Sequence, residues 1–252
     1  MVFGIEDKNV LVVGASKGIG KSISLGFARE RAKVTAIARS EDLLLDLYTE
    51  MKEITDSNHA YYAADLMESD ANKLARQLIS ERGIFDIVVH CVGGSLVGRN
   101  ALGTLDEWQH AWMFNAGIAI NMNNVLIQPM IDKGWGRVIH ISSISAVMLR
   151  GNPLYASAKA FLNAYVTTVG RAIAATGVVM TAILPGAVAF PGSYWDQYTY
   201  TDPDRCKDFL KEHQAVNRFG TTKEIADVAL FLAGEQASFM QAALIPVDGA
   251  NM

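Results

Sequence analysis

The chain has 252 residues, of which 50% are hydrophobic and 19% are charged, and its formal net charge is −4. This is the composition of a globular protein, and a chain of this length buries enough surface to fold without disulfides. The mildly acidic balance gives no reason to expect nucleic acid or an anionic membrane as a partner.

Residues 1–8 include two acidic side chains and no long apolar run, so we expect no signal peptide. No stretch of 18 uncharged apolar residues follows, so we expect no transmembrane helix, no membrane partner and a cytoplasmic location. Cys91 and Cys206 have no CxxC spacing, which predicts two free thiols and no metal site.

Short apolar runs alternate with stretches of helical period along the chain. The predicted strands are Val10–Val13, Lys33–Ala38, Ala60–Ala64, Ile87–Val92, Arg137–Ile141, Val178–Leu184 and Leu244–Val247. The predicted helices are Ile19–Glu30, Asp42–Ile54, Ala71–Glu81, Leu105–Ile131, Pro153–Ala175 and Lys223–Leu232. Apolar strands that alternate with helices are typical of a parallel sheet covered on both faces. We therefore predict an α/β fold, a doubly wound parallel sheet of the Rossmann type, in a single domain spanning residues 1–252.

The segment of residues 190–218 departs from this alternation. It contains Pro191, Gly192, Pro203 and four aromatic residues in the stretch 194–200. A connection this long is more often functional than passive. We predict that it forms a lid over the substrate.

The first predicted strand runs directly into the sequence GASKGIG at residues 14–20, and a helix follows. Glycines permit a tight turn and a close approach of the backbone to a ligand. The amino end of the helix then offers free N–H groups to a pyrophosphate. The spacing is GxxxGxG rather than the GxGxxG of the common dinucleotide fingerprint. Its place between the first strand and the first helix favours a phosphate loop over a purely structural turn.

The end of the second strand indicates which nicotinamide cofactor is bound. NAD-selective sites place an acidic residue there to hold the ribose 2′-OH, whereas this strand ends with Ala38, Arg39 and Ser40. The Arg39 guanidinium can grip a 2′-phosphate, and Lys17 in the glycine loop adds a second positive charge. Both cations could be solvated surface groups, but their joint placement predicts NADP(H).

Ser142 and Ser143 end the fifth strand, and Tyr155 and Lys159 follow on the next helix, which Asn152 is placed to cap. Tyr155 and Lys159 are four residues apart, so they project from one face of that helix. A phenol with a pKa near ~10 is a poor base, so we expect the Lys159 ammonium to lower the pKa of Tyr155. The pattern predicts acid/base chemistry at Tyr155, with a serine hydroxyl on the substrate oxygen.

Taken together, these motifs resemble the short-chain dehydrogenase/reductase family over essentially the full length of the chain, in particular its members similar to 3-oxoacyl-(acyl carrier protein) reductases. The resemblance rests on GASKGIG at 14–20, Asp65, Val92-Gly93, Asn115, Ser142-Ser143, Tyr155-x-x-x-Lys159, Leu184-Pro185-Gly186 and Pro246-Val247-Asp248-Gly249, in that order. It implies an NADP(H)-dependent oxidoreductase that interconverts an alcohol and a ketone or aldehyde by hydride transfer.

The resemblance also implies roles for individual residues. Asn115 would hold a helix kink and a water that relays protons to Lys159. Ser143 would orient the substrate and Tyr155 would be the general acid/base, while Lys159 would also grip the nicotinamide ribose. The residues expected to contact the cofactor are Gly14, Ser16, Lys17, Gly18, Ile19, Gly20, Arg39, Ser40, Asp65, Leu66, Val92, Gly93, Tyr155, Lys159, Pro185, Gly186 and Val188.

Three positions depart from the family pattern. Residues 90–93 read His-Cys-Val-Gly where the family usually has Asn-Asn-Ala-Gly, and we expect His90 to be structural rather than a ligand of the cofactor ribose. Phe190 replaces a threonine, which would remove one hydrogen bond to the cofactor. Residues 250–252 replace the usual run after the terminal Asp-Gly.

The loop between the serines and Tyr155 is a fourth departure. It is one residue shorter than the common spacing if Ser143 is the catalytic serine. Ser142 and Ser145 therefore stay open as alternative substrate-orienting residues.

The substrate and the assembly are less constrained. A 3-oxoacyl thioester suits the length and pattern, whereas polar groups that could ring the pocket suit a sugar or another polar hydroxy compound. This ring comprises Gly93-Gly94-Ser95, Arg99, Arg150, Asn152 and Tyr194-Trp195-Asp196. A non-catalytic NADP-binding regulator on the same fold is the alternative of another class, although Tyr155 and Lys159 are both present. The family usually forms homotetramers or homodimers, and candidate seam residues are Phe161, Val169, Ile173, Phe231 and Leu232.

Overall fold

One sheet of parallel strands forms the centre of the molecule. In this computed structural model, which describes residues 3–95 and 101–251, the strands are β1 (Asn9–Val13), β2 (Lys33–Ala38), β3 (Ala60–Ala63), β4 (Ile87–His90), β5 (Gly136–Ile141), β6 (Val178–Pro185) and β7 (Leu244–Val247). Their order across the sheet is β3-β2-β1-β4-β5-β6-β7, and every pairing is parallel. The predicted doubly wound α/β fold is confirmed.

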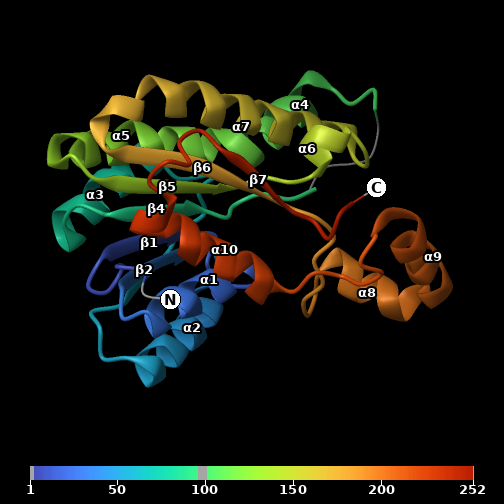
Figure 1. Cartoon of the computed structure of the whole chain (residues 1–252), viewed down its shortest axis with the longest axis horizontal. Helices are drawn as coiled ribbons and strands as arrows, with labels where there is room; N and C mark the ends of the chain where they lie inside the picture. Colours follow the sequence, from blue (N-terminus) through green and yellow to red (C-terminus); the bar gives the residue numbers. More distant parts are fainter. Residues whose placement is uncertain (1–2, 96–100, 252) are drawn as a thin grey trace.

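Helices cover both faces of this sheet (Figure 1). One face carries α1 (Gly18–Arg29), α2 (Glu41–Ile54) and α10 (Thr222–Ala233), and the other carries α3 (Ala71–Arg82), α5 (Ile118–Lys133) and α7 (Pro153–Ala172). The strands β1, β4 and β6 are buried on both faces because each of their surfaces meets a helix layer. The hydrophobic core is accordingly divided in two, one cluster on each side of the sheet.

The predicted long helix of residues 105–131 is not continuous. It is observed as α4 (Leu105–Trp112), one π-helical turn (Met113–Gly117) and α5. The π turn contains Asn115, where the family resemblance implied a kink. A short helix, α6 (Ser145–Met148), follows β5 and was not predicted.

The segment of residues 190–218, which we predict to be a lid, contains two helices that the sequence pattern did not predict. These are α8 (Tyr194–Thr201) and α9 (Pro203–His213), which lie to one side of the main body (Figure 1). Ser193 caps the first of them and Asp202 caps the second, each through its side-chain oxygen. Within residues 3–95 and 101–251, no helix is long and apolar enough to cross a membrane; the location in the cell stays a prediction.

Candidate active site

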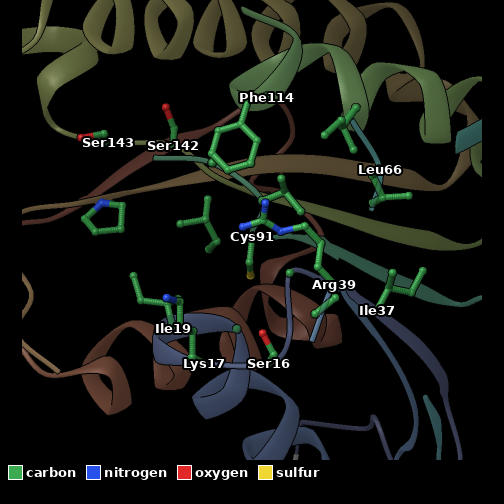
Figure 2. A pocket seen from close by; sticks show the side chains of 18 of the residues that line it. Ser16, Lys17, Ile19, Ile37, Arg39, Leu66, Cys91, Phe114, Ser142 and Ser143 are labelled. Carbon is green, nitrogen blue, oxygen red and sulfur yellow. The ribbon is translucent and has the colours of Figure 1, made fainter. Parts of the chain in front are cut away.

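A cavity of about 440 Å³ opens at the carboxyl ends of the strands. It lies where β1 and β4 are neighbours and the chain has turned to opposite sides of the sheet, which is the usual ligand site of doubly wound folds. All the residues predicted to contact the cofactor line it, apart from Gly18. Figure 2 shows Ser16, Lys17 and Ile19 on one side of this cavity, with Ser142, Ser143 and Phe114 on the other.

The glycine loop between β1 and α1 is held by its backbone. Gly14 N–H donates to the Ile37 carbonyl at 2.8 Å, which ties the turn to β2. A Cβ on Gly14 would lie 2.8 Å from the Val92 nitrogen, and one on Gly20 would lie 2.0 Å from the Gly14 carbonyl oxygen. Gly18, the first residue of α1, has a φ of +58°, which favours glycine. The loop therefore depends on glycine at these positions and presents the amino end of α1 to the cavity.

Arg39 and Asp65 lie together at the end of the cavity formed by β2 and β3. The Arg39 guanidinium is 3.8 Å from the Asp65 carboxylate, and both side chains are partly exposed. The other Asp65 oxygen accepts a hydrogen bond from Met67 N–H at 2.9 Å. A long, exposed ion pair of this kind is weak, so Arg39 can turn to a phosphate at little cost.

Tyr155 and Lys159 project from the first turns of α7 into the cavity. The Asn152 side chain accepts hydrogen bonds from Leu154 N–H at 3.0 Å and Tyr155 N–H at 3.4 Å, and Pro153 occupies the first turn. The predicted cap is confirmed. It fixes the start of the helix and with it the direction in which Tyr155 points.

The three candidate serines have different surroundings. The Ser142 residue is buried, and its hydroxyl donates to Asn163 Oδ1 at 2.6 Å. The Ser143 hydroxyl is hydrogen-bonded to Tyr155 and also accepts from Ser145 N–H at 3.1 Å. Of the three, only Ser143 therefore shares a hydrogen bond with the tyrosine.

The pKa of Tyr155 differs from the expectation. Burial raises it above its ordinary value, and the hydrogen bond with Ser143 opposes that rise only in part. Lys159 does not lower it, because its ammonium is 5.9 Å from the Tyr155 ring centre and donates instead to the Ile141 carbonyl at 2.8 Å. Burial lowers the pKa of Lys159 itself to about 8. Tyr155 is therefore protonated at neutral pH in this structure.

Asn115 does not line the cavity. Its side chain holds the loop after β4: Oδ1 accepts from Gly94 N–H at 2.8 Å, and Nδ2 donates to the carbonyls of Gly94 and Ala111 at 3.1 and 3.0 Å. A Cβ on Gly93 would lie 2.7 Å from both Asn115 Oδ1 and Lys159 Nζ. Asn115 and Lys159 are thus separated only by this glycine.

The segment after β6 closes the cavity. Ile144 N–H donates to the Pro185 carbonyl at 3.0 Å, which joins the serine loop to this segment. Gly186 packs against the chain terminus, since a Cβ there would lie 2.7 Å from Asp248 backbone atoms. The sequence Pro246-Val247-Asp248-Gly249, which resembles the family pattern, therefore packs behind Pro185 and Gly186, which line the cavity.

His90 does not line the cavity. It is buried, its Nε2 lies 2.8 Å from Asn123 Oδ1, and its ring stacks on His140. These contacts agree with the structural role that we expected. Its neighbour Cys91 does reach the cavity, and burial raises the pKa of its thiol to about 12, so this thiol is uncharged.

Several lining residues were not predicted. They are Ile37, Ala38, Leu43, Ala64, Met67, Cys91, Phe114, Ile118 and Ile141. Most of them are neighbours in sequence of a predicted residue. Their position next to the end of a strand is the sequence signal that could have identified them. Of the ring suggested for the substrate, Trp195 lines the cavity, whereas Ser95, Arg150, Asn152 and Asp196 do not. The Asn152 side-chain amide donates to the Ser95 hydroxyl at 2.7 Å. Arg99 lies outside the described residues. No group of three or more His, Cys, Asp or Glu that could hold a metal occurs within the described ranges.

Comparison with known proteins extends these observations. A family model described as enoyl-(acyl carrier protein) reductase matches residues 14–250. The glucose 1-dehydrogenase of Gluconobacter oxydans is 28% identical over 246 residues, which are 96% of this chain and 91% of that protein. The 3-oxoacyl-[acyl-carrier-protein] reductase of Chlamydia muridarum is 28% identical over 252 residues, and 97% of each chain is covered. The L-sorbose reductase of Gluconobacter frateurii, solved with NADPH and L-sorbose, has a TM-score of 0.90 at 27% identity, and covers 99% of this chain and 98% of its own.

Proposed function

The chain belongs to the short-chain dehydrogenase/reductase family, and we propose that it interconverts an alcohol and a ketone or aldehyde by hydride transfer with NADP(H). One observation carries this proposal: the glycine loop, Arg39 and the Ser143–Tyr155 pair all line a single cavity. The residues that would bind phosphate and the residues that would donate a proton therefore face the same cavity.

The described residues fit NADP(H). The glycine loop lines the cavity and brings the amino end of α1 to it, and this helix end favours a pyrophosphate. Glycine at positions 14 and 20 makes the tight turn possible, because a Cβ at either position would meet backbone atoms. At the β2 end, the exposed Arg39 suits a 2′-phosphate. The similar L-sorbose reductase was solved with NADPH, which supports the same choice of cofactor here.

When bound, the cofactor would supply or accept the hydride. The proton would be handled by the chain itself: Ser143 would hold the carbonyl oxygen by a hydrogen bond, and Tyr155 would donate its proton to that oxygen. Because burial raises the pKa of Tyr155, the phenol holds this proton at neutral pH and is prepared for carbonyl reduction. Lys159 would grip the ribose and keep a positive charge beside the reacting centre.

A calorimetric titration with NADPH and, separately, with NADH tests the cofactor. We expect tight binding of NADPH and a clear preference over NADH, because only NADPH has a ribose 2′-phosphate that Arg39 can bind. Failure of both to bind would refute the cofactor assignment. A preference for NADH would refute the role of Arg39 alone.

The Tyr155→Phe substitution tests the chemistry. It removes one hydroxyl, and we expect turnover to be lost while the Kd for NADPH stays within about threefold, since the remaining ring still fills its place. Tyr62→Phe is the matched control, because it also removes one hydroxyl, which donates to Glu81, and neither of these residues lines the cavity. Activity of Tyr155→Phe within about tenfold of the parent would remove Tyr155 from its role.

For the substrate, we propose a 3-oxoacyl thioester. The similar protein from Chlamydia muridarum is named as a 3-oxoacyl-[acyl-carrier-protein] reductase. Phe114 and Trp195 line the cavity that also holds Ser143 and Tyr155, and these two rings would pack against the acyl chain. The proposal predicts NADPH oxidation with acetoacetyl-CoA.

A sugar or another polar hydroxy compound is the second candidate. The likeness to an L-sorbose reductase favours it. Parallel assays with acetoacetyl-CoA and L-sorbose, both followed by NADPH absorbance, separate the two. Turnover of L-sorbose alone would exclude the thioester.

We further propose a homotetramer or homodimer. Phe161 on α7 is 46% exposed and packs edge-on against Trp112, which would suit a seam along that helix. Leu232, another candidate for the seam, is 1% exposed and belongs to the core of the subunit. Sedimentation equilibrium measures the mass, and a monomer at micromolar concentration would refute the proposal.

A further inference from the structure

A cluster of polar side chains lies buried behind the catalytic end of the sheet. His90 on β4 and His140 on β5 are register partners, and their rings stack with centres 4.9 Å apart and planes 20° apart. Asn123 on α5 reaches both rings: its Oδ1 lies 2.8 Å from His90 Nε2 and its Nδ2 lies 3.3 Å from His140 Nε2. Asn123 Nδ2 also donates to the hydroxyl of Tyr165 on α7 at 3.1 Å.

A single carboxamide forces opposite tautomers on the two rings. An amide oxygen only accepts, so His90 carries its hydrogen on Nε2; an amide nitrogen only donates, so His140 carries its hydrogen on Nδ1. Exchanging the oxygen and nitrogen of Asn123 would exchange the tautomers and keep them opposite. Protonation of His140 would add a hydrogen on Nε2, which would point at the N–H group of Asn123 Nδ2. This arrangement therefore requires that the His140 ring be neutral.

The chain segment that carries His140 also holds Lys159. The next residue, Ile141, accepts the Lys159 ammonium hydrogen bond through its carbonyl at 2.8 Å. Burial, then the neighbouring His90 and Lys159, lower the pKa of His140 well below its usual value. The orientation of the Ile141 carbonyl therefore depends on how the end of β5 is held.

We propose that His140 is a positioning residue for Lys159, acting in a clamp that His90 and Asn123 complete. The clamp ties the ends of β4 and β5 to α5, so that Lys159 stays on the Ile141 carbonyl and out of water. The role of Lys159 in turnover rests on the proposed function, whereas the clamp itself does not.

The clamp also governs the charge state of Lys159. The titratable groups that face this ammonium are Cys91 from β4, His140 from β5 and Tyr155 from its own helix. His140 in turn faces His90 and Tyr165. None of these carries a negative charge at neutral pH, so burial sets the pKa of Lys159 at about 8. Opening the clamp would admit water and raise that pKa.

The test replaces His140 by asparagine and follows Lys159 in the intact protein. We expect NMR titration of carbon-13-labelled lysine to show the pKa of Lys159 rising by about one unit. We expect kcat at neutral pH to fall about tenfold, and the Kd for NADPH to stay within about threefold. His59→Asn is the matched control, since His59 is also buried and accepts Val34 N–H at 3.2 Å, but at the opposite end of the strands. That variant should lower Tm without moving the Lys159 titration.

Equal Lys159 titrations in the His140→Asn and His59→Asn variants would overturn the proposal. Should His140→Asn fail to fold, the parent still decides the matter: nitrogen-15 spectra must show one of the two rings protonated at Nδ1 and the other at Nε2. Two identical tautomers would refute the clamp. A parent that reduces neither carbonyl probe, with the Lys159 shift still present in His140→Asn, would refute the proposed function and leave the clamp standing.

Discussion

The glycine loop (residues 14–20), which we propose to hold the cofactor phosphates, and the predicted lid (residues 190–218) line the same cavity but are held in place differently. The loop is constrained by its backbone, because a Cβ on Gly20 would lie 2.0 Å from the Gly14 carbonyl oxygen. Aromatic side chains pack the lid helices: the ring centres of Trp195 and Phe209 are 4.1 Å apart, and those of Trp195 and Phe219 are 5.3 Å apart. Among the described residues, backbone pairing is confined to the end of the lid, where Gln214 pairs with Asn251 and Val216 N–H donates to the Gly249 carbonyl. Backbone constraints of the first kind admit few substitutions, whereas aromatic packing of the second kind can be rebuilt with other side chains.

The lid contacts the glycine loop through Phe190. The Phe190 ring lies against Gly18, with its nearest atom 2.6 Å from the place that a Gly18 Cβ would occupy. Through this contact the lid rests on the start of α1. We infer that changes in the loop act on cofactor binding and folding together, while changes in the lid act on the substrate.

Of the substitutions considered, Gly20→Ala in the glycine loop should have the largest effect on stability and on NADPH binding. The added methyl meets backbone atoms, which cannot move aside as a side chain can. We expect the free energy of unfolding to fall by about 3 kcal/mol, the upper range for overpacking, and calorimetry to detect no NADPH binding. Gly26→Ala on the same helix is the control, because its Cβ would meet only the Leu230 side chain, at 3.2 Å. Normal NADPH binding by Gly20→Ala would show that the loop is not constrained in this way.

Arg39→Ala probes the other end of the cofactor cavity. The lost charge-assisted contact should weaken NADPH by about 1–3 kcal/mol and leave NADH almost unchanged. Stability should hardly alter, because the pair with Asp65 is long and exposed. Arg29→Ala, an exposed cation near the far end of α1, is the control. An equal loss for both cofactors would show that Arg39 does not meet the 2′-phosphate.

The loop and the sheet could be predicted from the sequence because buried parallel strands are continuous apolar runs. The bounds of β2 and β7 agree with the prediction, and the glycine spacing located the turn after β1. The π turn at Asn115 was not found from the hydrophobic period. One extra residue in a turn shifts the phase of that period, but residues 111–131 are apolar around most of the helix, so the shift leaves little trace in the sequence. Only the family resemblance indicated a kink there.

Other features of the site needed coordinates. Adjacent residues at a strand end face different neighbours, so spacing could not choose between Ser142 and Ser143. The four-residue spacing placed Lys159 on the same helix face as Tyr155 but could not show that its ammonium bonds the Ile141 carbonyl. The lid helices were missed because proline and aromatic residues resemble a loop, although Ser193 followed by Asp196 is a helix-start signal.

Trp195→Ala tests the lid side of the comparison and should have a moderate effect. Its ring lines the cavity, so we expect the KM for the carbonyl substrate to rise roughly tenfold while the Kd for NADPH stays within about twofold. Tyr200→Ala on the same helix is the control, since that ring is 80% exposed. If the binding of substrate and of NADPH were weakened equally, the lid would also hold the cofactor. The inference that the loop binds the cofactor and the lid binds the substrate would then be wrong.

Arg218→Ala, at the junction of the lid and α10, should have the smallest effect. Arg218 binds Glu224 at 2.6 and 3.0 Å, and these bonds, with a further one from Thr221 N–H, lower the pKa of Glu224 to about 2. Between pH 4.5 and about 2, Glu224 is therefore ionised in the folded chain and becomes protonated in the unfolded chain. The stabilisation from this ion pair is complete above pH 4.5 and is lost as the pH falls toward 2. Both side chains are largely exposed, so the loss in Tm should be small at neutral pH and should vanish toward pH 2. Lys223→Ala, which breaks an exposed pair with Asp227, is the control, and a Tm difference for Arg218→Ala that is independent of pH would show that the ion pair does not anchor the lid.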